Sequence, residues 1–320
     1  IGDWSSDVCS SDLLTPKYDP NYSNQTSLSE VTEEEFNANL NSTKATTQDR
    51  IIQLLLFIFG FGWLRLLILI PATLAYVVLI MIPLAFHKNP ILLSIGIKIT
   101  QVYFRVAFFC LGLVWITKKG KIDPRTRCFL FNHQTVIDGP LIYIFKPFTV
   151  IGMAELKNKP LIGQILSAID TVFVDRSKNE GTSKILTDYL ESDRPYPMAL
   201  SPEGKTTKGD FLLQFRTGSF IAKVPLQIVT IRYKQYFPFG KTGVIWLVGG
   251  MKEWLIRIMC MPFFTCELEF MDTMDSEEFM NKDPKEKALE CNLIMANKLS
   301  TKASNRSTRE IGRASCRERV

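Results

Sequence analysis

One of the two histidines in this 320-residue chain, His133, lies in a polar peptide whose side chains could move a proton. Imidazole is the side chain whose charge ordinarily changes between about pH 5 and 8, so a general base that works near neutral pH points to His133. The other histidine, His87, lies where a long apolar run ends. Asp138 follows His133 by five residues. On a regular helix this spacing places the two side chains on different faces, so they meet only if the chain turns between them.

The elements around this pair suit such a turn. Residues 126–131 form an apolar run that predicts a buried strand leading into His133. Asp138 then starts a predicted helix with Pro140 in its first turn, where a missing N–H costs nothing. A base after a strand and a carboxylate at the start of the next helix are typical of a base and the group that orients it. The pair alone is also compatible with two ordinary surface residues.

A second polar signature follows another short apolar run. Residues 197–200 predict a strand that leads into the sequence SPEGKTTKG at 201–209. Gly204 and Gly209 allow a close approach of the backbone, and the lysines and threonines between and beside them supply cationic and hydroxyl donors. Such a loop could hold a phosphate. The alternative interpretation is an ordinary polar turn.

Composition narrows the classes of function. The formal net charge is +6, which suits an anionic membrane surface or a phosphorylated substrate. The sequence has no dense stripe of basic and aromatic residues, so it does not predict a nucleic-acid partner. The seven cysteines form no CxxC pair and only two histidines are present, so we expect no metal site.

A long apolar segment, Ile51–Phe86, raises the mean hydropathy of the chain to +0.08. Arg65 divides it, and Leu66–Phe86 is uncharged and about as long as a transmembrane helix requires. We expect Ile51–Leu64 either to lie in the membrane interface or to form a hairpin with Leu66–Phe86. We expect Ile91–Thr117, which contains charged residues, to be an interfacial amphipathic helix rather than a second span. The lysines that follow, Lys118, Lys119 and Lys121, favour a cytosolic position for the later domain.

The organisation that we expect has six parts. Residues 1–13 and 310–320 resemble translated sequencing-adapter sequence and are treated as non-native. Residues 14–50 are polar and are expected to be disordered, with glycosylation sequons at Asn21, Asn24 and Asn41. Residues 51–117 form membrane-anchoring helices, 118–275 the catalytic domain, and 276–309 a C-terminal helical region.

The alternation of apolar runs with helical patterns predicts an α/β fold. We expect a mixed, largely parallel sheet flanked by helices and preceded by one or more membrane helices. The candidate strands are Arg127–Asn132, Phe148–Met153, Thr171–Asp175, Pro197–Ser201, Leu226–Arg232, Gly243–Val248 and Thr265–Met271.

Four sequence blocks resemble, in order and spacing, those of the glycerophospholipid acyltransferases, the PlsC-like family. They are NHQTVID at 132–138, VFVDR at 172–176, SPEGKTT at 201–207 and VPLQIVTIRY at 224–233. The sequence at 209–220 looks most like the lysophosphatidylcholine and lysophosphatidylethanolamine acyltransferase branch. The resemblance covers roughly a third of the chain. Two positions depart from the pattern, because Ser201 replaces a hydrophobic residue and Lys205 replaces a threonine that Thr206 could supply.

The resemblance implies roles for the matching residues. His133 would be the general base, and Asp138 would orient it and stabilise its charged form. Arg176 would contact the phosphate of the acceptor, and Glu203 and Gly204 would shape the acceptor site. The candidate substrate-binding residues, from the resemblance and from the donors of the 201–209 loop together, are Asn132, Arg176, Glu203, Gly204, Lys205 and Thr206.

The resemblance also implies a reaction and a place. The protein would transfer an acyl chain from acyl-CoA, as co-substrate and without a cofactor, to the free hydroxyl of a lysophospholipid or acylglycerol phosphate. It would contact membrane phospholipids, most simply in the endoplasmic reticulum with the catalytic domain facing the cytosol. The alternative is a non-catalytic membrane adaptor built on the same domain. A serine hydrolase is disfavoured because the chain has no G-x-S-x-G sequence.

Overall fold

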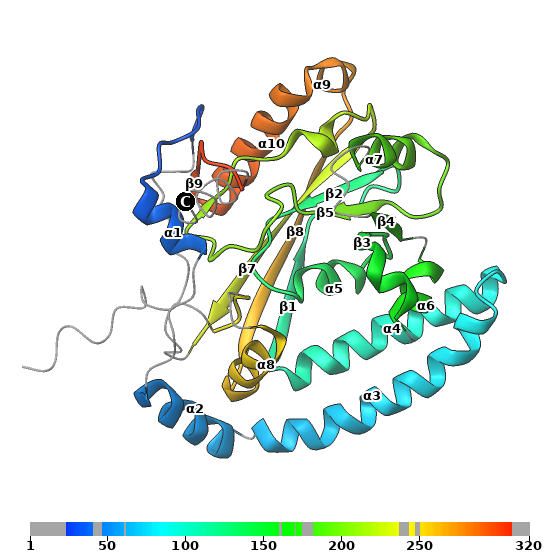
Figure 1. Cartoon of the computed structure of the whole chain (residues 1–320), viewed down its shortest axis with the longest axis vertical. Helices are drawn as coiled ribbons and strands as arrows, with labels where there is room; N and C mark the ends of the chain where they lie inside the picture. The colour runs from blue at the N-terminus through cyan, green and yellow to red at the C-terminus, as the bar shows by residue number, and fades with distance from the viewer. Residues whose placement is uncertain are drawn as a thin grey trace, which may run out of the picture.

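The computed structural model describes residues 24–40, 47–60, 62–159, 162–169, 171–174, 182–236, 243–246 and 250–308. A twisted sheet crosses the centre of the molecule with helices on both faces, and a long helical hairpin lies along one side (Figure 1). The N-terminal helix α1 (Glu33–Leu40) and the C-terminal strand β9 (Lys302–Ala303) lie together at the opposite side.

The central sheet has five strands in the order β1-β8-β7-β2-β5. Their bounds are β1 Leu113–Lys119, β2 Cys128–Phe131, β5 Met198–Leu200, β7 Leu226–Gln235 and β8 Phe264–Met274. Strand β1 is parallel to β8, and β2 is parallel to both β5 and β7, whereas β7 and β8 are antiparallel. The predicted mixed and largely parallel sheet is therefore confirmed.

Strand β2 is at the centre of the fold because every one of its side chains is buried. Alternate side chains of a strand point to opposite faces. Phe129 and Phe131 join one hydrophobic cluster, and Cys128 and Leu130 join the other. Helices α5 (Asp138–Tyr143) and α8 (Gly250–Cys260) cover the first face, and α10 (Pro284–Leu299) covers the second. The end of β2 is thus held from both sides, which fixes the direction of the chain that follows it.

The smaller elements complete the two faces. A parallel bridge from Thr149 to Met198 joins the central sheet to a second sheet of two parallel strands. A third, two-stranded parallel sheet pairs β6 with β9. The bounds are β3 Ile151–Met153, β4 Val172–Val174, β6 Phe211–Leu212, α6 Ile162–Ala168, α7 Thr182–Glu191 and α9 Glu277–Asn281.

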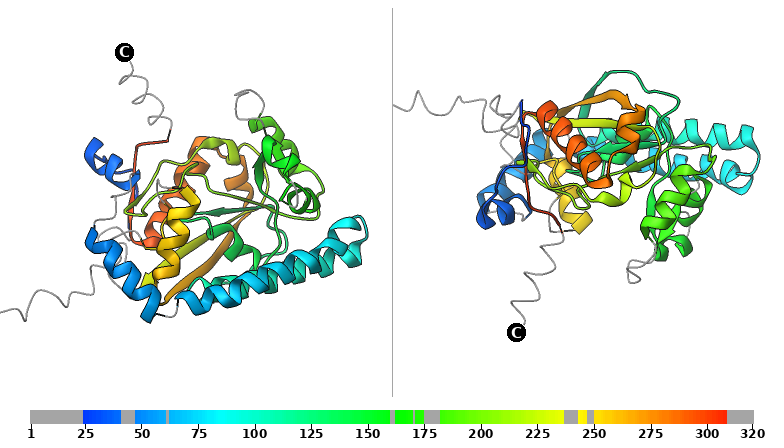
Figure 2. Two further views of the ribbon diagram at one scale, coloured as in Figure 1. Left: turned by 60° about the horizontal axis from the view of Figure 1, so that its bottom comes forward. Right: turned by 90° about the horizontal axis from the view of Figure 1, so that it is seen from above.

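Three apolar helices precede the sheet: α2 (Thr47–Phe59), α3 (Gly62–Ala85) and α4 (Pro90–Cys110). Helices α3 and α4 pack against each other as an antiparallel hairpin (Figure 2), and both are long and apolar enough to cross a membrane by length and composition. Only 17% and 22% of their most apolar windows are buried in the molecule. The outer faces of the hairpin therefore have no protein covering among the described residues.

Several expectations about local structure are wrong. The segment Ile91–Thr117 is not one helix, since α4 ends at Cys110 and Gly112, with a φ of +95°, turns the chain into β1. The expected boundary between residues 117 and 118 consequently falls inside a strand. Residues 243–246 of the expected strand Gly243–Val248 are not in a strand, and 247–248 lie outside the described residues.

The expectation that residues 14–50 are disordered is wrong for residues 24–40, and also for residues 47–50, which begin helix α2. Helix α1 begins with a reciprocal capping pair, in which Glu35 N–H donates to Thr32 Oγ1 (3.2 Å) and Thr32 N–H donates to Glu35 Oε2 (2.9 Å). Phe36 and Leu40 are buried against the domain, and Ser29 pairs with Ser304. The segment folds because it covers apolar surface that the sheet leaves open.

Candidate active site

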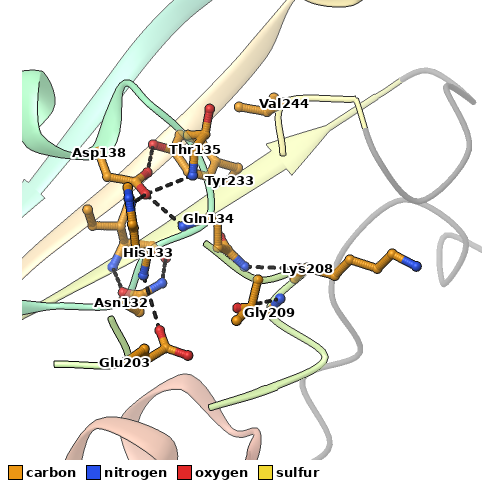
Figure 3. Close-up of polar contacts among 12 residues, drawn as sticks. Asn132, His133, Gln134, Thr135, Asp138, Glu203, Lys208, Gly209, Tyr233 and Val244 are labelled. Atoms are coloured by element: carbon orange, nitrogen blue, oxygen red, sulfur yellow. Dashed lines mark hydrogen bonds and ion pairs between the residues drawn. The ribbon is translucent and has the colours of Figure 1, made fainter. Parts of the chain in front are cut away.

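The chain turns sharply between β2 and α5, and the turn brings His133 and Asp138 together (Figure 3). His133 Nδ1 lies 2.9 Å from Asp138 Oδ2. The same carboxylate oxygen accepts the backbone N–H groups of Gln134 (2.7 Å) and Thr135 (2.8 Å). A carboxylate that ties down the backbone of the turn also fixes the imidazole at its start, so the predicted pair exists as a built unit.

A tyrosine from the neighbouring strand completes this unit. The Tyr233 hydroxyl, on β7, donates to the second oxygen of Asp138, Oδ1. Both side chains are buried, with 2% of Tyr233 and none of Asp138 exposed. Burial, together with the nearby Asp138 carboxylate, raises the pKa of the Tyr233 hydroxyl well above its usual range, so it stays protonated and remains a donor. Asp138 thus receives four hydrogen bonds.

The orientation of His133 follows from these contacts. With Nδ1 donating to the carboxylate, the lone pair of a neutral imidazole is on Nε2. The side chain keeps 29% of its surface exposed, and its ring packs edge-on against Phe131 with centroids 5.7 Å apart. The imidazole is therefore held on one side and accessible on the other, as a general base requires.

Asn132 has a positioning role in this structure. Its amide nitrogen donates to the Ile231 carbonyl (2.9 Å), and its amide oxygen accepts the Ile231 N–H (2.8 Å). The side chain is buried and pairs with β7 where the backbone pairing of β2 has ended. The expected contact of Asn132 with substrate does not follow from this placement, because both polar atoms are engaged inside the protein.

Glu203 is fully buried directly beneath the histidine. Its Oε1 accepts the His133 N–H (3.2 Å) and its Oε2 accepts the Leu213 N–H (3.1 Å). Burial raises the pKa of the Glu203 carboxyl to about 7, against the opposing effect of these two hydrogen bonds. The carboxyl reaches backbone rather than open space, so it shapes the site by clamping the histidine segment to Leu213, the residue that follows β6.

The loop after Glu203 closes over the histidine segment. Thr207 N–H donates to the His133 carbonyl (2.9 Å), and Gln134 Nε2 donates to the Lys208 carbonyl (3.2 Å). Gly209 has a φ of +82°, and a Cβ there would lie 1.7 Å from Gln134 Nε2, so only glycine fits.

The remaining expected residues differ in what the structure says of them. Gly204 has a φ of +73°, and a Cβ would lie 2.5 Å from Arg216 Nε, so close packing explains this glycine. Lys205 and Thr206 lie half-buried on the same loop. Arg176 lies outside the described residues. Among those that are described, no group of three or more His, Cys, Asp and Glu side chains is arranged to hold a metal ion.

Sequence reasoning missed three supports of the site. Tyr233 is the last residue of the fourth block, and its position there was the available signal. Asn39 of α1 is fully buried and holds the loop through Lys208 N–H (3.0 Å, to its carbonyl) and Asp210 N–H (3.3 Å, to its side chain). Trp246 N–H donates to the Gln134 carbonyl (2.7 Å). No local pattern marks the last two, since both act across long stretches of sequence.

The surroundings favour direct chemistry by the base. Burial raises the pKa values of the Cys128 and Cys266 thiols well above their ordinary range, so these two cysteines are poor sources of a thiolate nucleophile. The fixed imidazole of His133 is open on one side, so it can remove a proton from a hydroxyl group. The buried carboxylate of Asp138 can then stabilise the positive charge that forms on the imidazole.

Comparison with known proteins points to one family. A family model described as Acyltransferase matches residues 116–234. The chain is 28% identical over 207 residues to lysophospholipid acyltransferase LPCAT4 of Xenopus tropicalis, which covers 62% of this chain and 39% of that protein. It is 30% identical over 141 residues to lysophospholipid acyltransferase LPEAT2 of Arabidopsis thaliana, which covers 42% of this chain and 26% of that protein.

A solved structure shares the fold. The crystal structure of the 1-acyl-sn-glycerophosphate (LPA) acyltransferase PlsC from Thermotoga maritima superposes with a TM-score of 0.51 at 17% identity, over 78% of this chain and 96% of that one. At this identity the likeness concerns the fold. The chain spans less than half of the length of the curated relatives that it matches. The match therefore covers the catalytic blocks and their surroundings rather than those whole proteins.

Proposed function

We propose that this chain is a membrane-bound O-acyltransferase. It belongs to the PlsC-like glycerophospholipid acyltransferase family, and it resembles the lysophosphatidylcholine and lysophosphatidylethanolamine branch of that family. It moves an acyl chain from acyl-CoA to the free hydroxyl of a lysophospholipid or an acylglycerol phosphate. The observation that carries the proposal is the hydrogen-bonded series Tyr233–Asp138–His133, which ends at a partly exposed imidazole.

The reaction is a direct transfer. His133 Nε2 removes the proton of the acceptor hydroxyl as its oxygen attacks the thioester carbonyl carbon, and Asp138 stabilises the imidazolium that forms. The tetrahedral intermediate then collapses, the carbon–sulfur bond breaks, and the CoA thiolate takes the proton from the imidazolium. Positioning and base catalysis suffice because a thiolate is a good leaving group.

The acceptor and the donor both carry phosphates, and we assign these to the cationic residues near the site. Arg176 and Lys205 are proposed to contact the acceptor phosphate, with Thr206 supplying a hydroxyl donor. The apolar hairpin α3–α4 would deliver the acceptor from the plane of the bilayer, with the catalytic domain on the cytosolic side of the endoplasmic reticulum. The intact pairing of His133 and Asp138 supports an enzyme over a non-catalytic adaptor.

The direct test is His133→Ala in purified full-length protein, with CoA release measured over a panel of lysolipids and acyl-CoA species. We expect the rate to fall by about 10²–10⁴-fold, the usual effect of losing a general base, while binding to vesicles is unchanged. His87→Ala is the matched control, because His87 is the other histidine and is exposed in the turn that follows α3. Near-normal CoA release by folded His133→Ala protein would overturn the proposal.

A further inference from the structure

Helix α8 has an outer face of unusual composition. Its exposed residues occur at positions 251, 252, 255 and 256, which together form one side of the helix. Met251, Leu255 and Ile256 are 57%, 38% and 44% exposed, and Lys252 is the polar member of the face. The outer face of a helix in water normally carries charged and polar residues. The exposed face of α10 follows that pattern, with Lys285 and Glu286 beside Leu289.

This face continues the apolar surface of the helices that precede the sheet. Helix α8 packs against α2 and the first part of α3, and the three lie together at one end of the molecule (Figures 1 and 2). Helix α2 exposes its own large apolar residues beside it. Those of α2 that are at least 41% exposed are Ile51, Ile52, Leu54, Leu55, Ile58 and Phe59.

Two arginines fix α8 to these helices. Arg65, the charge that interrupts the apolar segment, donates to the carbonyls of Met259 (2.7 Å), Met261 (2.6 Å) and Pro262 (3.4 Å). These carbonyls lie at the C-terminal end of α8, where a helix has acceptors without partners and favours a cation. Arg50 of α2 pairs with Glu253 at 3.3 Å. The orientation of α8 relative to α2 and α3 is therefore set by direct contacts.

The level of α8 relative to a bilayer follows from the same region. Trp63, at the start of α3, is 45% exposed, and its indole N–H donates to the Ile58 carbonyl (3.1 Å). Exposed tryptophans next to apolar helices are typical of the headgroup region. Arg65, two residues further on, reaches the C-terminal end of α8 and holds that end beside the start of α3. Lys252 suits anionic headgroups at that depth.

We propose that the outer face of α8, formed by Met251, Lys252, Leu255 and Ile256, contacts the lipid headgroup region and sets the height of the active site above the bilayer. The inference rests on the proposed function, since it assumes that α3 and α4 are in a membrane. It assigns lipid contact to a helix of the catalytic domain itself, and names the bilayer, rather than a protein, as the partner of this face.

The inner side of α8 connects this face to the catalytic histidine. Trp254 Nε1 donates to the Val244 carbonyl (2.9 Å), and Arg257 donates to the carbonyls of Gly243 (3.2 Å) and Ile245 (2.7 Å). The next residue along, Trp246, donates its N–H to the Gln134 carbonyl (2.7 Å). A helix resting on the bilayer would thus hold the histidine segment through residues 243–246.

The test measures lipid contact at single labelled positions of the full chain in vesicles of phosphatidylcholine and phosphatidylserine. A polarity-sensitive fluorophore is attached to Leu255→Cys, and to Leu289→Cys as the matched control, because Leu289 is a leucine of similar exposure, 40%, on α10. Ile70→Cys on α3 reports on the anchor. Cys9 and Cys316 are changed to serine, and the five described cysteines are buried.

Quenching by lipids spin-labelled near the headgroup is expected at Leu255→Cys and absent at Leu289→Cys. Equal quenching at these two positions would overturn the proposal, as would a Leu255→Cys label that a second protein copy protects but lipid does not quench. An Ile70→Cys label that no lipid quenches would instead contradict the membrane anchor of the proposed function, so the two failures are distinguishable.

A kinetic measurement tests the consequence for height. Leu255→Gln combined with Ile256→Gln is expected to lower the rate several-fold with acceptor embedded in vesicles, and to leave the rate unchanged with a short-chain acceptor dissolved as monomers. Leu289→Gln serves as the control. A loss that is equal for both forms of the acceptor would indicate a structural effect and would contradict the proposal.

Discussion

At the scale of single residues, the site depends on a buried carboxylate whose two oxygens are both engaged by hydrogen-bond donors. Asp138 is fully buried, and a lone carboxylate in such a place would be costly. Four donors surround it, three of them local to the turn and one, Tyr233, from another strand. Hydrogen bonds to the charged form favour that form. We therefore regard Tyr233 as a positioning residue that acts on the base through Asp138.

Tyr233→Phe should lower the catalytic rate by about tenfold to a hundredfold, because a hydrogen bond to a charged group contributes about 1.5–3 kcal/mol. Because Tyr233 is buried and acts on the base through Asp138, kcat should fall while the KM values of both substrates stay nearly unchanged. Tyr236→Phe is the control, because Tyr236 is 41% exposed. An unchanged kcat in folded Tyr233→Phe protein would show that Tyr233 contributes packing alone.

At the scale of elements, the sequence predicts what is local. The turn between β2 and α5 was predictable because both of its partners lie within seven residues, and a proline and a carboxylate mark the start of the helix. Strand β1 was not predictable, because the apolar residues of α4 continue through Leu111 into β1. Gly112 is the one residue that interrupts this apolar run. Residues 243–246 look like a strand in the sequence. In the structure, Trp254 and Arg257 of α8 donate hydrogen bonds to the carbonyls of residues 243–245. These donors lie 10 to 14 residues further along the chain and leave no periodic pattern in the segment itself.

Helix α1 offers the sharpest test at this scale. Asn39→Ala removes two hydrogen bonds: a partly buried one from Asp210 N–H to its side-chain oxygen, and a buried one from its amide to the Phe211 carbonyl (3.2 Å). The loop that packs on Gln134 would keep the bond from Lys208 N–H to the backbone carbonyl of residue 39 but lose the side-chain part of its support. We expect the free energy of unfolding to fall by about 1–3 kcal/mol and the acyl-transfer rate to fall with it.

The control for this change lies on the same helix. Asn37 is exposed, so Asn37→Ala should leave both quantities unchanged. Unfolding by urea and CoA release measured on the same preparations would decide. If Asn39→Ala behaves like Asn37→Ala in both measurements, α1 covers the domain without supporting its active site.

At the scale of the whole molecule, the order of the elements constrains how the chain meets a membrane. Residues 24–40 fold onto the catalytic domain, with Ser29 paired to Ser304 and Asn39 bonded to the loop beside His133. The apolar helices come between these two parts of one folded unit in the sequence. The chain must therefore leave the domain and return to it on the same side. The sequence-based arrangement, one spanning helix followed by an interfacial helix, would place the two parts on opposite sides and is incompatible with this fold.

The antiparallel hairpin of α3 and α4 resolves the conflict, because a pair of helices returns the chain to the side from which it came. In sealed microsomes, an epitope at the N-terminus and one at the C-terminus should both be digested by added protease. The sequon at Asn24, on the described part of that segment, should remain unglycosylated, as shown by an unchanged mobility after endoglycosidase treatment. The control is a variant that carries a cleavable signal peptide and an added sequon within residues 24–32. Its glycosylation would show that this segment can be modified when it is luminal.

The contradicting outcome is protection of the N-terminal epitope together with digestion of the catalytic domain. It would mean that residues 24–40 do not pack on the domain in the membrane, and therefore that Asn39 does not support the histidine segment there.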